Sequence, residues 1–169
     1  HCVDTFVIYD DVNFIKGGWI NRNRYLYQNQ PKIFNIIMQD ASSFKKINEI
    51  GLMQSNNSYN PMKKMMSTFA MAYRKAPYYD ETVSLLEQIA SYKETNMSRF
   101  IENSLRVISN YLDITTNILV SSDLEKTEGL AKEKRVIDIC KRLEADIYVN
   151  AIGGKELYNA GEFGENGII

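Results

Sequence analysis

The stretch Asn117-Ile118-Leu119-Val120-Ser121 has the length and apolar character of a buried strand, and the segments after it decide the fold class. Apolar residues recur at helical spacing over residues 130–143, a second strand is expected over 146–150, and a short helical segment over 155–158. The chain then reaches an apolar stretch at 167–169 that is typical of a further strand. The order strand, helix, strand, short helix, strand predicts an α/β fold with a mainly parallel sheet flanked by helices.

The preceding half of the chain adds a strand and a hairpin. Residues 5–9 are an apolar run that is expected to form a buried strand. Aromatic and β-branched residues at 21–27 and 33–38, joined by turn formers at 28–31, predict a β-hairpin. A short edge strand is expected within residues 46–53.

A helical insertion is predicted between Asn60 and Leu112. Asn60 can cap a helix whose first residue is Pro61, because proline is well suited to the first helical position. Asp80 and Ser98 are the expected caps of a second and a third helix, each followed by apolar residues at helical spacing. The insertion therefore consists of three helices.

Composition excludes several classes of function. The chain has 169 residues and a formal net charge of −1, so no global basic field recruits nucleic acid. No apolar run approaches the roughly 18 residues of a membrane-spanning helix. Two cysteines, Cys2 and Cys140, suit a reducing cytoplasm and not a disulfide scaffold. We expect one cytoplasmic domain over residues 1–169, with no nucleic-acid partner and no membrane insertion; a homo-oligomer is compatible with this composition.

The histidine count limits the chemistry further. The only histidine, His1, lies at the chain terminus, so a Ser-His-Asp or Cys-His site is excluded. Two scattered cysteines and a terminal histidine cannot form a closed zinc site. Acid–base chemistry would therefore use carboxylates, lysine, tyrosine or a group on the substrate. No particular cofactor is indicated; a metal, if one is used, would be a hard cation such as Mg²⁺ held by carboxylate oxygens.

Asp10 and Asp11 are the candidate catalytic residues. They follow the strand predicted at 5–9, so they are expected at its carboxyl end, where open α/β sheets bind ligands. Two adjacent carboxylates can hold a divalent ion against phosphate, or one can accept hydrogen bonds from a sugar hydroxyl. The alternative is a polar turn that ends the strand, since aspartate is a common turn former.

The string Trp19-Ile20-Asn21-Arg22-Asn23-Arg24 is the most unusual in the chain. On a strand, Asn21 and Asn23 share one face and the two arginines share the other. Paired guanidinium groups bind phosphate or carboxylate, Lys16 adds charge nearby, and Trp19 offers a flat surface to a ring. The alternative is a solvated face on which arginine stems cover apolar neighbours.

Weaker candidates lie in the last third of the chain. Ser122 and Asp123 follow the strand at 117–121, where they can bind phosphate or cap the next segment. Arg135 belongs to a basic group at the start of a helix, which indicates either a bound anion or a solvated face. The remaining candidates, where glycine lets the backbone approach a ligand, are Asn150, Gly153 and Gly154. Tyr78-Tyr79, beside Pro77, is either an interface or a substrate contact.

Five segments together resemble the WbqC-like family. They are residues 3–14 (VDTFVIYDDVNF), 18–24 (GWINRNR), 121–124 (SSDL), 135–140 (RVIDIC) and 148–158 (YVNAIGGKELY), in the expected order over essentially the whole chain. The Asp-Asp-Val and Trp-Ile-Asn-Arg-Asn-Arg strings are the most specific. The resemblance implies a bacterial, cytoplasmic protein associated with O-antigen or other surface-polysaccharide gene clusters, including those for lipopolysaccharide, and described only loosely as a transferase or as uncharacterised.

The chain departs from this family pattern at both ends. Family members resemble one another in a short strand, a Gln-Pro segment and an aromatic-rich Gly-Tyr-Phe helix placed before the region that starts at residue 1. They also continue beyond the position of Ile169. We therefore expect the chain to be a fragment that lacks the N-terminal strand, loop and helix and the C-terminal tail.

The residues and the resemblance together suggest a group transferase of the acyl or aminoacyl type that acts on a nucleotide-linked sugar or another phosphorylated small molecule. Arg22 and Arg24 would bind the diphosphate, Asp10 or Asp11 would hold a sugar hydroxyl or Mg²⁺, and the diglycine turn would line the pocket. Positioning and charge stabilisation would then carry the rate more than proton transfer.

Two alternatives stay open at this stage. One is a non-catalytic binding module that docks onto a sugar-modifying enzyme through the methionine-rich helix containing Met62, Met65 and Met66. The simpler explanation of that methionine stripe is core packing. The other alternative is a glycosyltransferase, which rests mainly on the paired aspartates after a strand.

Overall fold

The computed structural model describes residues 2–56, 58–154 and 157–169. His1 and residues 155–156 of the short helical segment expected at 155–158 lie outside the described residues. The chain divides into two compact units, His1–Ser122 and Asp123–Ile169, each of which is described by itself.

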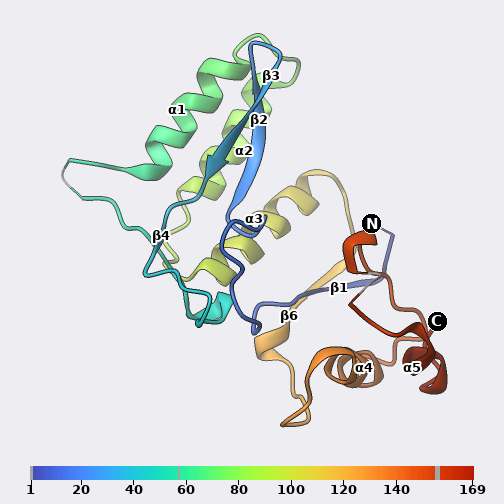
Figure 1. Cartoon of the computed structure of the whole chain (residues 1–169). Helices are drawn as coiled ribbons and strands as arrows, with labels where there is room; N and C mark the ends of the chain where they lie inside the picture. Colours follow the sequence, from blue (N-terminus) through green and yellow to red (C-terminus); the bar gives the residue numbers. More distant parts are fainter. Residues whose placement is uncertain (1, 57, 155–156) are drawn as a thin grey trace. The chain divides into compact units, whose positions relative to one another are not determined.

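The first unit contains a parallel pair of strands (Figure 1). β1 (Thr5–Ile8) lies beside β6 (Asn117–Val120), with Thr5 opposite Asn117 and Ile8 opposite Val120. Both predicted strands are present, each one residue shorter than predicted. Ile8, Ile118 and Val120 are buried, and Leu105 packs against them. The carboxyl ends of the two strands therefore lie at the same edge, ahead of Asp10 and Ser121 respectively.

The predicted hairpin is formed by β2 (Arg22–Tyr27) and β3 (Gln30–Asn35), which pair antiparallel. The turn residues Gln28 and Asn29 have φ angles of 51° and 60°, as a two-residue type I′ turn requires. β3 begins earlier than predicted because Pro31 is accommodated within it. Its partner Leu26 donates its N–H to Tyr73 Oη and not to β3, so the missing proline N–H removes no hydrogen bond from the pair.

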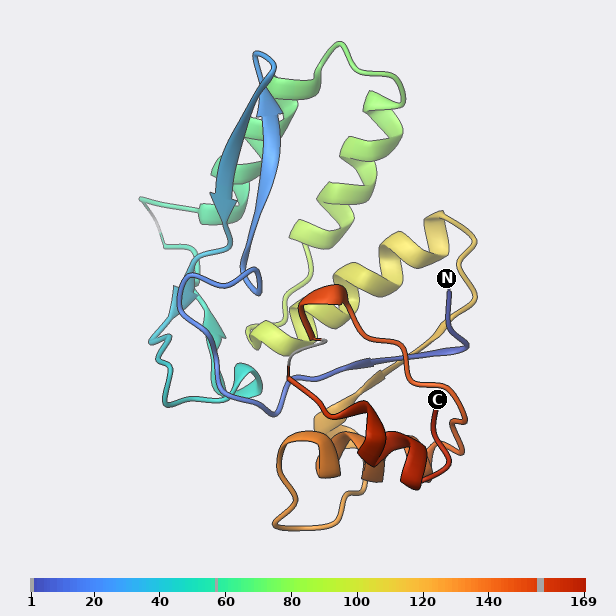
Figure 2. The same ribbon diagram turned by 45° about the vertical axis from the view of Figure 1, so that its right-hand side comes forward.

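Helix α1 (Pro61–Tyr73) begins as predicted, because Asn60 Oδ1 accepts a hydrogen bond from Lys63 N at 2.9 Å. Its buried Phe69 makes edge-to-face contacts with Tyr25 and Phe34, at centroid distances of 5.6 and 4.9 Å. Figure 2 shows the hairpin lying along this helix. A two-stranded hairpin is marginally stable alone in water, so α1 supplies the apolar layer that it needs.

Helix α2 (Tyr79–Ala90) confirms the second predicted helix but not its predicted cap. The helix begins after Tyr78, which has a left-handed φ of 59°, and Asp80 lies in the first turn instead of before it. A carboxylate in the first turn still faces the positive end of the helix dipole. Asp80 therefore suits its position electrostatically without being the capping residue.

Helix α3 (Met97–Tyr111) is also present, and its predicted cap, Ser98, is wrong. Asn96 is the cap: its Oδ1 accepts hydrogen bonds from the backbone N–H groups of Ser98 and Arg99, at 2.9 and 3.3 Å. The Ser98 hydroxyl points elsewhere and donates to Asp10. The hydroxyl that the local pattern predicted as the cap is thus used in a tertiary hydrogen bond to Asp10.

The main core of the first unit joins the loop after β1 to helices α2 and α3. β4 (Met38–Gln39) pairs antiparallel with β5 (Gly51–Leu52), which follows the short 3₁₀ helix η1 (Ile47–Glu49). The edge strand expected within 46–53 is therefore only two residues long. The buried core residues are Phe14, Ile50, Leu52, Ile89, Met97 and Phe100, and Met62 packs against them. At least this member of the methionine stripe is accordingly used for core packing.

The second unit contains the helix predicted at 130–143, now α4 (Lys132–Arg142), and a further helix, α5 (Ala160–Glu165), beyond the expected short segment. Two 3₁₀ turns complete the assigned elements: η2 (Ser121–Asp123), which spans the junction of the units, and η3 (Ile152–Gly154). Phe163 of α5 is buried and stacks on Tyr148 at 5.0 Å between ring centroids.

The strands expected at 146–150 and 167–169 are not formed. Ile169 N donates to Asp146 O at 2.9 Å, and Ile169 O accepts a hydrogen bond from Tyr148 N at 2.8 Å. This backbone pairing extends no further in the described residues. Ile147 and Val149 are 59% and 58% exposed, so the apolar residues of the segment do not gain the burial that stabilises a sheet.

A mainly parallel sheet flanked by helices is therefore not confirmed. In the described ranges the strands form three two-stranded sheets, of which only the β1–β6 pair is parallel. Helices and strands, the hairpin and the helical insertion are present as predicted. Of the helices described, none combines the length and the apolar character needed to cross a bilayer.

Replacement of Phe69 by alanine should lower the free energy of unfolding by about 3–4 kcal/mol, because it leaves a cavity between α1 and the hairpin. Met71, on the same helix, is 66% exposed, so Met71→Ala should change it by less than about 0.5 kcal/mol. Urea denaturation followed by circular dichroism measures both. Equal losses in the two variants would contradict the packing described here.

Asp138 on α4 should make the second unit sensitive to acid. The Thr127 N–H donates to its carboxylate and, together with the Thr127 hydroxyl and the Arg142 guanidinium, holds its pKa below the ordinary value of 3.8. The stabilisation is complete above that value and is lost as pH falls through the lower folded-state pKa. Asp138→Asn should therefore lower the urea midpoint at pH 7, and the difference from wild type should shrink below pH 3.8. Asp146→Asn, on an exposed residue of the same unit, is the control; a pH-independent difference for Asp138→Asn would refute the linkage.

Candidate functional site

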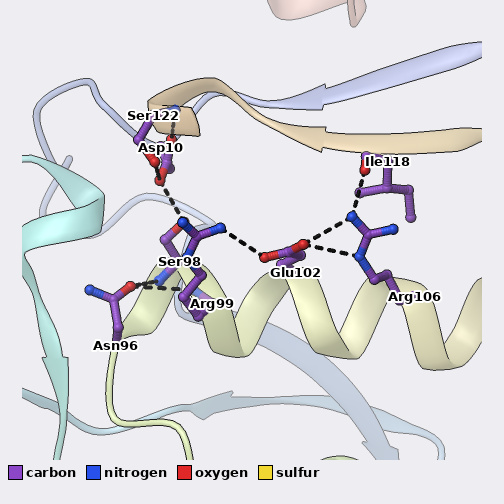
Figure 3. A network of polar contacts seen from close by, with 8 residues as sticks. All are labelled: Asp10, Asn96, Ser98, Arg99, Glu102, Arg106, Ile118 and Ser122. Carbon is purple, nitrogen blue, oxygen red and sulfur yellow. Dashed lines mark hydrogen bonds and ion pairs between the residues drawn. The ribbon is translucent and has the colours of Figure 1, made fainter. Parts of the chain in front are cut away.

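A buried carboxylate joins the carboxyl ends of the two parallel strands to the start of α3 (Figure 3). Asp10 is 1% exposed. Its Oδ2 accepts hydrogen bonds from the hydroxyls of Ser98 and Ser122, at 2.7 and 2.8 Å, and its Oδ1 accepts one from Ser122 N at 2.9 Å. Ser98 lies in the first turn of α3, where the helix dipole also favours a negative charge.

Asp11 makes the matching contact with the preceding serine. Its Oδ1 accepts a hydrogen bond from the Ser121 hydroxyl at 2.8 Å, and both side chains are buried. Each acidic residue after β1 is therefore paired with a serine after β6. The structure brings Asp10, Asp11 and Ser122 of the predicted site together, at the edge of the sheet where the sequence had placed them.

This arrangement determines what Asp10 can do chemically. Its two oxygens already accept three hydrogen bonds. A cation bound at Oδ1 would lie beside the Ser122 N–H, which is a donor and cannot be a ligand to a metal ion. Within the part of the chain that the structure describes, no group of three or more His, Cys, Asp or Glu side chains is arranged to hold a metal ion. The local geometry fits a positioning group better than a magnesium ligand.

A ladder of charges continues along α3 from this cluster (Figure 3). Glu102 accepts hydrogen bonds from Arg99 Nη1 at 3.1 Å and from Arg106 Nε at 3.0 Å. Arg106 Nη2 also donates to Ile118 O at 2.6 Å, which ties β6 to the helix. Arg106 lines a polar hollow of about 480 Å³ at the amino end of β6, but its guanidinium is already bound to Glu102 and to Ile118 O, and the acidic Asp113 also lines the hollow. That hollow is therefore a poor candidate for an anion site.

The two predicted anion-binding arginines meet on a tryptophan. The guanidinium carbons of Arg22 and Arg24 both lie 4.9 Å from the centroid of the Trp19 ring, which is 55% exposed. Neither guanidinium forms an ion pair with a carboxylate of the described residues, and Arg22 Nε is buried without a hydrogen-bond partner among them. Two uncompensated positive charges that share one flat ring favour a bound anion.

The neighbouring candidates have different roles in the structure. Asn21 Nδ2 donates to Ile36 O at 3.0 Å and so anchors the end of the hairpin. Asn23 Oδ1 accepts a hydrogen bond from Arg24 N at 2.8 Å. Lys16 is exposed in the turn before Trp19, where Gly17 supplies the required positive φ of 75°. Asn23 also lines a pocket.

That pocket has a volume of about 420 Å³ and lies between β2 and helices α1 and α2. Asn23 and Arg24 contribute to its wall, so it adjoins the arginine pair. Most of its aromatic lining was not predicted from the sequence: only Tyr79 was singled out, and Tyr25, Phe34, Phe69 and Tyr73 were not. The signal that could have found them is the aromatic residues near the arginines and after the methionine stripe, such as Tyr25 and Tyr73.

The remaining predicted residues belong to the second unit. Asp123 ends the η2 turn, and Arg135 lies half-buried in the first turn of α4. Gly154 is buried, and a Cβ at that position would collide with the side chain of Asn150, whereas Gly153 is exposed with free space around it. The side chain of Asn150 thus fills the space that a side chain at position 154 would need. A ligand-binding role for these five residues stays a prediction.

Comparison with known proteins gives a family and one distant relative. The sequence model of the WbqC-like protein family matches residues 1–169, the whole chain. The chain is 27% identical over 168 residues to "Uncharacterized protein Rv1507c" of Mycobacterium tuberculosis (strain ATCC 25618 / H37Rv), a match that covers 98% of this chain and 70% of the relative. No solved structure matches the chain.

Asp10→Ala should lower the free energy of unfolding by roughly 3 kcal/mol, because it leaves the buried donors of Ser98 and Ser122 without an acceptor. The exposed Asp4 is a matched control, and Asp4→Ala should change stability by less than about 0.5 kcal/mol. Urea denaturation measures both. A loss below about 1 kcal/mol for Asp10→Ala would show that this carboxylate does not hold the strand ends and α3 together.

Proposed function

The chain belongs to the WbqC-like protein family, and we propose that it binds a nucleotide-linked sugar through Arg22 and Arg24 and acts as a group transferase of the acyl or aminoacyl type. The observation that carries the proposal is the uncompensated arginine pair on the exposed Trp19 ring. Paired guanidinium groups match the oxygens of a diphosphate, and this is the only anion site that the proposal needs.

We assign a separate role to each residue of the proposed site. Arg22 and Arg24 bind the diphosphate, and the adjoining pocket leaves room for the organic part of the ligand. Asp10 is assigned to positioning, because its oxygens already accept three hydrogen bonds. Asp11, beyond the carboxyl end of β1, is the proposed contact for a sugar hydroxyl. Because Asp11 is buried and accepts the Ser121 hydroxyl, the sugar hydroxyl would take the place of that serine at its Oδ1. With no histidine in the described residues, charge stabilisation and orientation carry the rate.

The Asp10 carboxylate, which already accepts three hydrogen bonds within the fold, also favours a second candidate function, a non-catalytic binding module that docks onto a sugar-modifying enzyme. A glycosyltransferase is less favoured, because the paired aspartates on which that alternative rested make hydrogen bonds to serines. The binding module predicts a stoichiometric complex with such an enzyme and no affinity of this chain itself for nucleotide sugars. Transferase and module are therefore separated by a binding measurement.

The biological setting is part of the proposal. We place the protein in the cytoplasm and in the biosynthesis of O-antigen or another surface polysaccharide of the lipopolysaccharide type. Two cysteines without a disulfide support the location: Cys2 and Cys140 are both free thiols. The resemblance to the family supports the pathway.

Removal of both arginines should abolish most of the ligand affinity. Trp19 is the only tryptophan of the chain, so its fluorescence reports binding at the arginine pair. We expect at least one of UDP-N-acetylglucosamine, GDP-mannose and dTDP-glucose to quench it and to bind by calorimetry. The Arg22→Ala, Arg24→Ala double variant should bind that ligand roughly 30-fold or more weakly, because two charge-assisted contacts are lost.

The control removes two positive charges elsewhere. Lys63 and Lys64 are exposed on α1, and the Lys63→Ala, Lys64→Ala variant should keep wild-type affinity. Equal loss in both double variants would mean that only net charge matters. If the wild-type protein binds none of the three nucleotide sugars, the proposed function is wrong.

A further inference from the structure

The pocket beside the arginine pair is built from aromatic rings that other contacts hold in place. Phe69 packs edge-to-face against Tyr25 and Phe34, and the three rings form one wall. Tyr73 Oη accepts the N–H of Leu26 at 2.6 Å, which ties its ring to the free edge of β2. Rings that are fixed before a ligand arrives lose little entropy when it binds.

The helix α2 provides the opposite wall. Tyr79, its first residue, lines the pocket together with Thr82 one turn later and with the aliphatic Val83 and Leu86. The space of about 420 Å³ is within the range of small-molecule sites, which run from about 300 to 1,000 Å³. The pocket therefore has ring-bearing walls contributed by three elements: the hairpin, α1 and α2.

The polar groups of the pocket are few and lie where the arginine pair begins. Among the described lining residues, the non-aromatic polar ones are Asn23, Arg24 and Thr82. Arg24 also contacts Trp19, so one residue belongs both to the pocket and to the proposed diphosphate site. Arg24 alternates with Asn23 and Tyr25 along β2, so its side chain leaves the strand on the other face. A ligand seated here would therefore pass around the free edge of β2, from an apolar flat part in the pocket to an anionic part at Arg24.

A flat heteroaromatic ring fits this lining better than a sugar does. A sugar ring carries several hydroxyls, and each one that is buried without a hydrogen-bond partner costs free energy. A nucleobase presents two apolar faces to aromatic rings and needs polar partners only along its edge. Asn23 and Thr82 are of the type that hydrogen-bonds such an edge, since an amide and a hydroxyl can each donate and accept.

We propose that this pocket binds the nucleoside part of the ligand, with the base among Tyr25, Phe34, Tyr73 and Tyr79 and the diphosphate extending to Arg24 and Arg22. The inference rests on the proposed function and assigns the orientation of the ligand within it. The nucleoside lies between the hairpin and α2, and the linked sugar, which receives the acyl or aminoacyl group, points away from the pocket, on the far side of the arginines. Nucleoside diphosphates that lack the linked sugar should then retain most of the affinity of the nucleotide sugar.

The test compares UDP, CDP, dTDP, GDP and ADP with inorganic pyrophosphate and glucose 1-phosphate, by Trp19 fluorescence and calorimetry on the whole chain. We expect at least one nucleoside diphosphate to bind about tenfold or more tightly than pyrophosphate, because the base adds stacking. In Tyr79→Ala that advantage should fall to about threefold or less, with pyrophosphate affinity unchanged. Tyr79→Phe keeps the ring and should keep the advantage.

Tyr78→Ala is the matched control, because Tyr78 is adjacent in sequence, 74% exposed and outside the pocket lining. Its affinities should equal those of the wild-type protein. Unchanged pyrophosphate binding by Tyr79→Ala shows at the same time that the variant is folded at the arginine pair.

Three outcomes would overturn the inference. If pyrophosphate binds as tightly as every nucleoside diphosphate, the arginine pair is an anion site but the pocket takes no base. If glucose 1-phosphate binds better than all of them, the pocket holds the sugar end and the orientation is reversed. If Tyr79→Ala binds nucleoside diphosphates as the wild-type protein does, the base lies elsewhere. Failure of the wild-type protein to bind any nucleotide sugar or diphosphate would instead overturn the proposed function itself.

Discussion

The carboxylate of Asp10 is the contact on which the architecture of the first unit depends. It accepts one hydrogen bond from α3, through Ser98, and two from the end of β6, through Ser122. Ser98 and Ser122 are 88 and 112 positions away from Asp10 in the chain. A buried charge is tolerated only when donors surround it, so the strand ends and the helix start must approach closely for this residue to be buried at all.

The arginine pair and Arg106 illustrate two uses of the same side chain. Arg106 pairs with Glu102, which it shares with Arg99, and donates to the carbonyl of Ile118, so its guanidinium is bound within the fold. Arg22 and Arg24 face an indole ring, which attracts a cation but cannot neutralise it. Uncompensated charge beside an aromatic pocket is the feature that distinguishes a binding region from a structural ion pair.

Local sequence patterns predicted the helices and strands better than the contacts that these elements make with distant segments. The hairpin was predictable because turn residues and β-branched arms lie within a few positions of each other, and the cap of α1 because Asn60 precedes Pro61. The caps of α2 and α3 were predicted wrongly, and at α3 a distant carboxylate had recruited the Ser98 hydroxyl. The extended parallel sheet failed for a related reason, since an apolar run such as 146–150 becomes a strand only where another strand offers pairing and burial.

The sequence by itself determined the types of side chain available for chemistry: one terminal histidine, paired aspartates after a strand, and alternating asparagine and arginine beside a single tryptophan. Strand periodicity also placed Arg22 and Arg24 on one face, because that relation is local. Only the tertiary structure decided that Asp10 is enclosed by serines and that rings from β2, β3, α1 and α2 surround a pocket next to Arg24. Burial and pairing of this kind are properties of contacts between distant segments, and neither composition nor periodicity encodes which segments will meet.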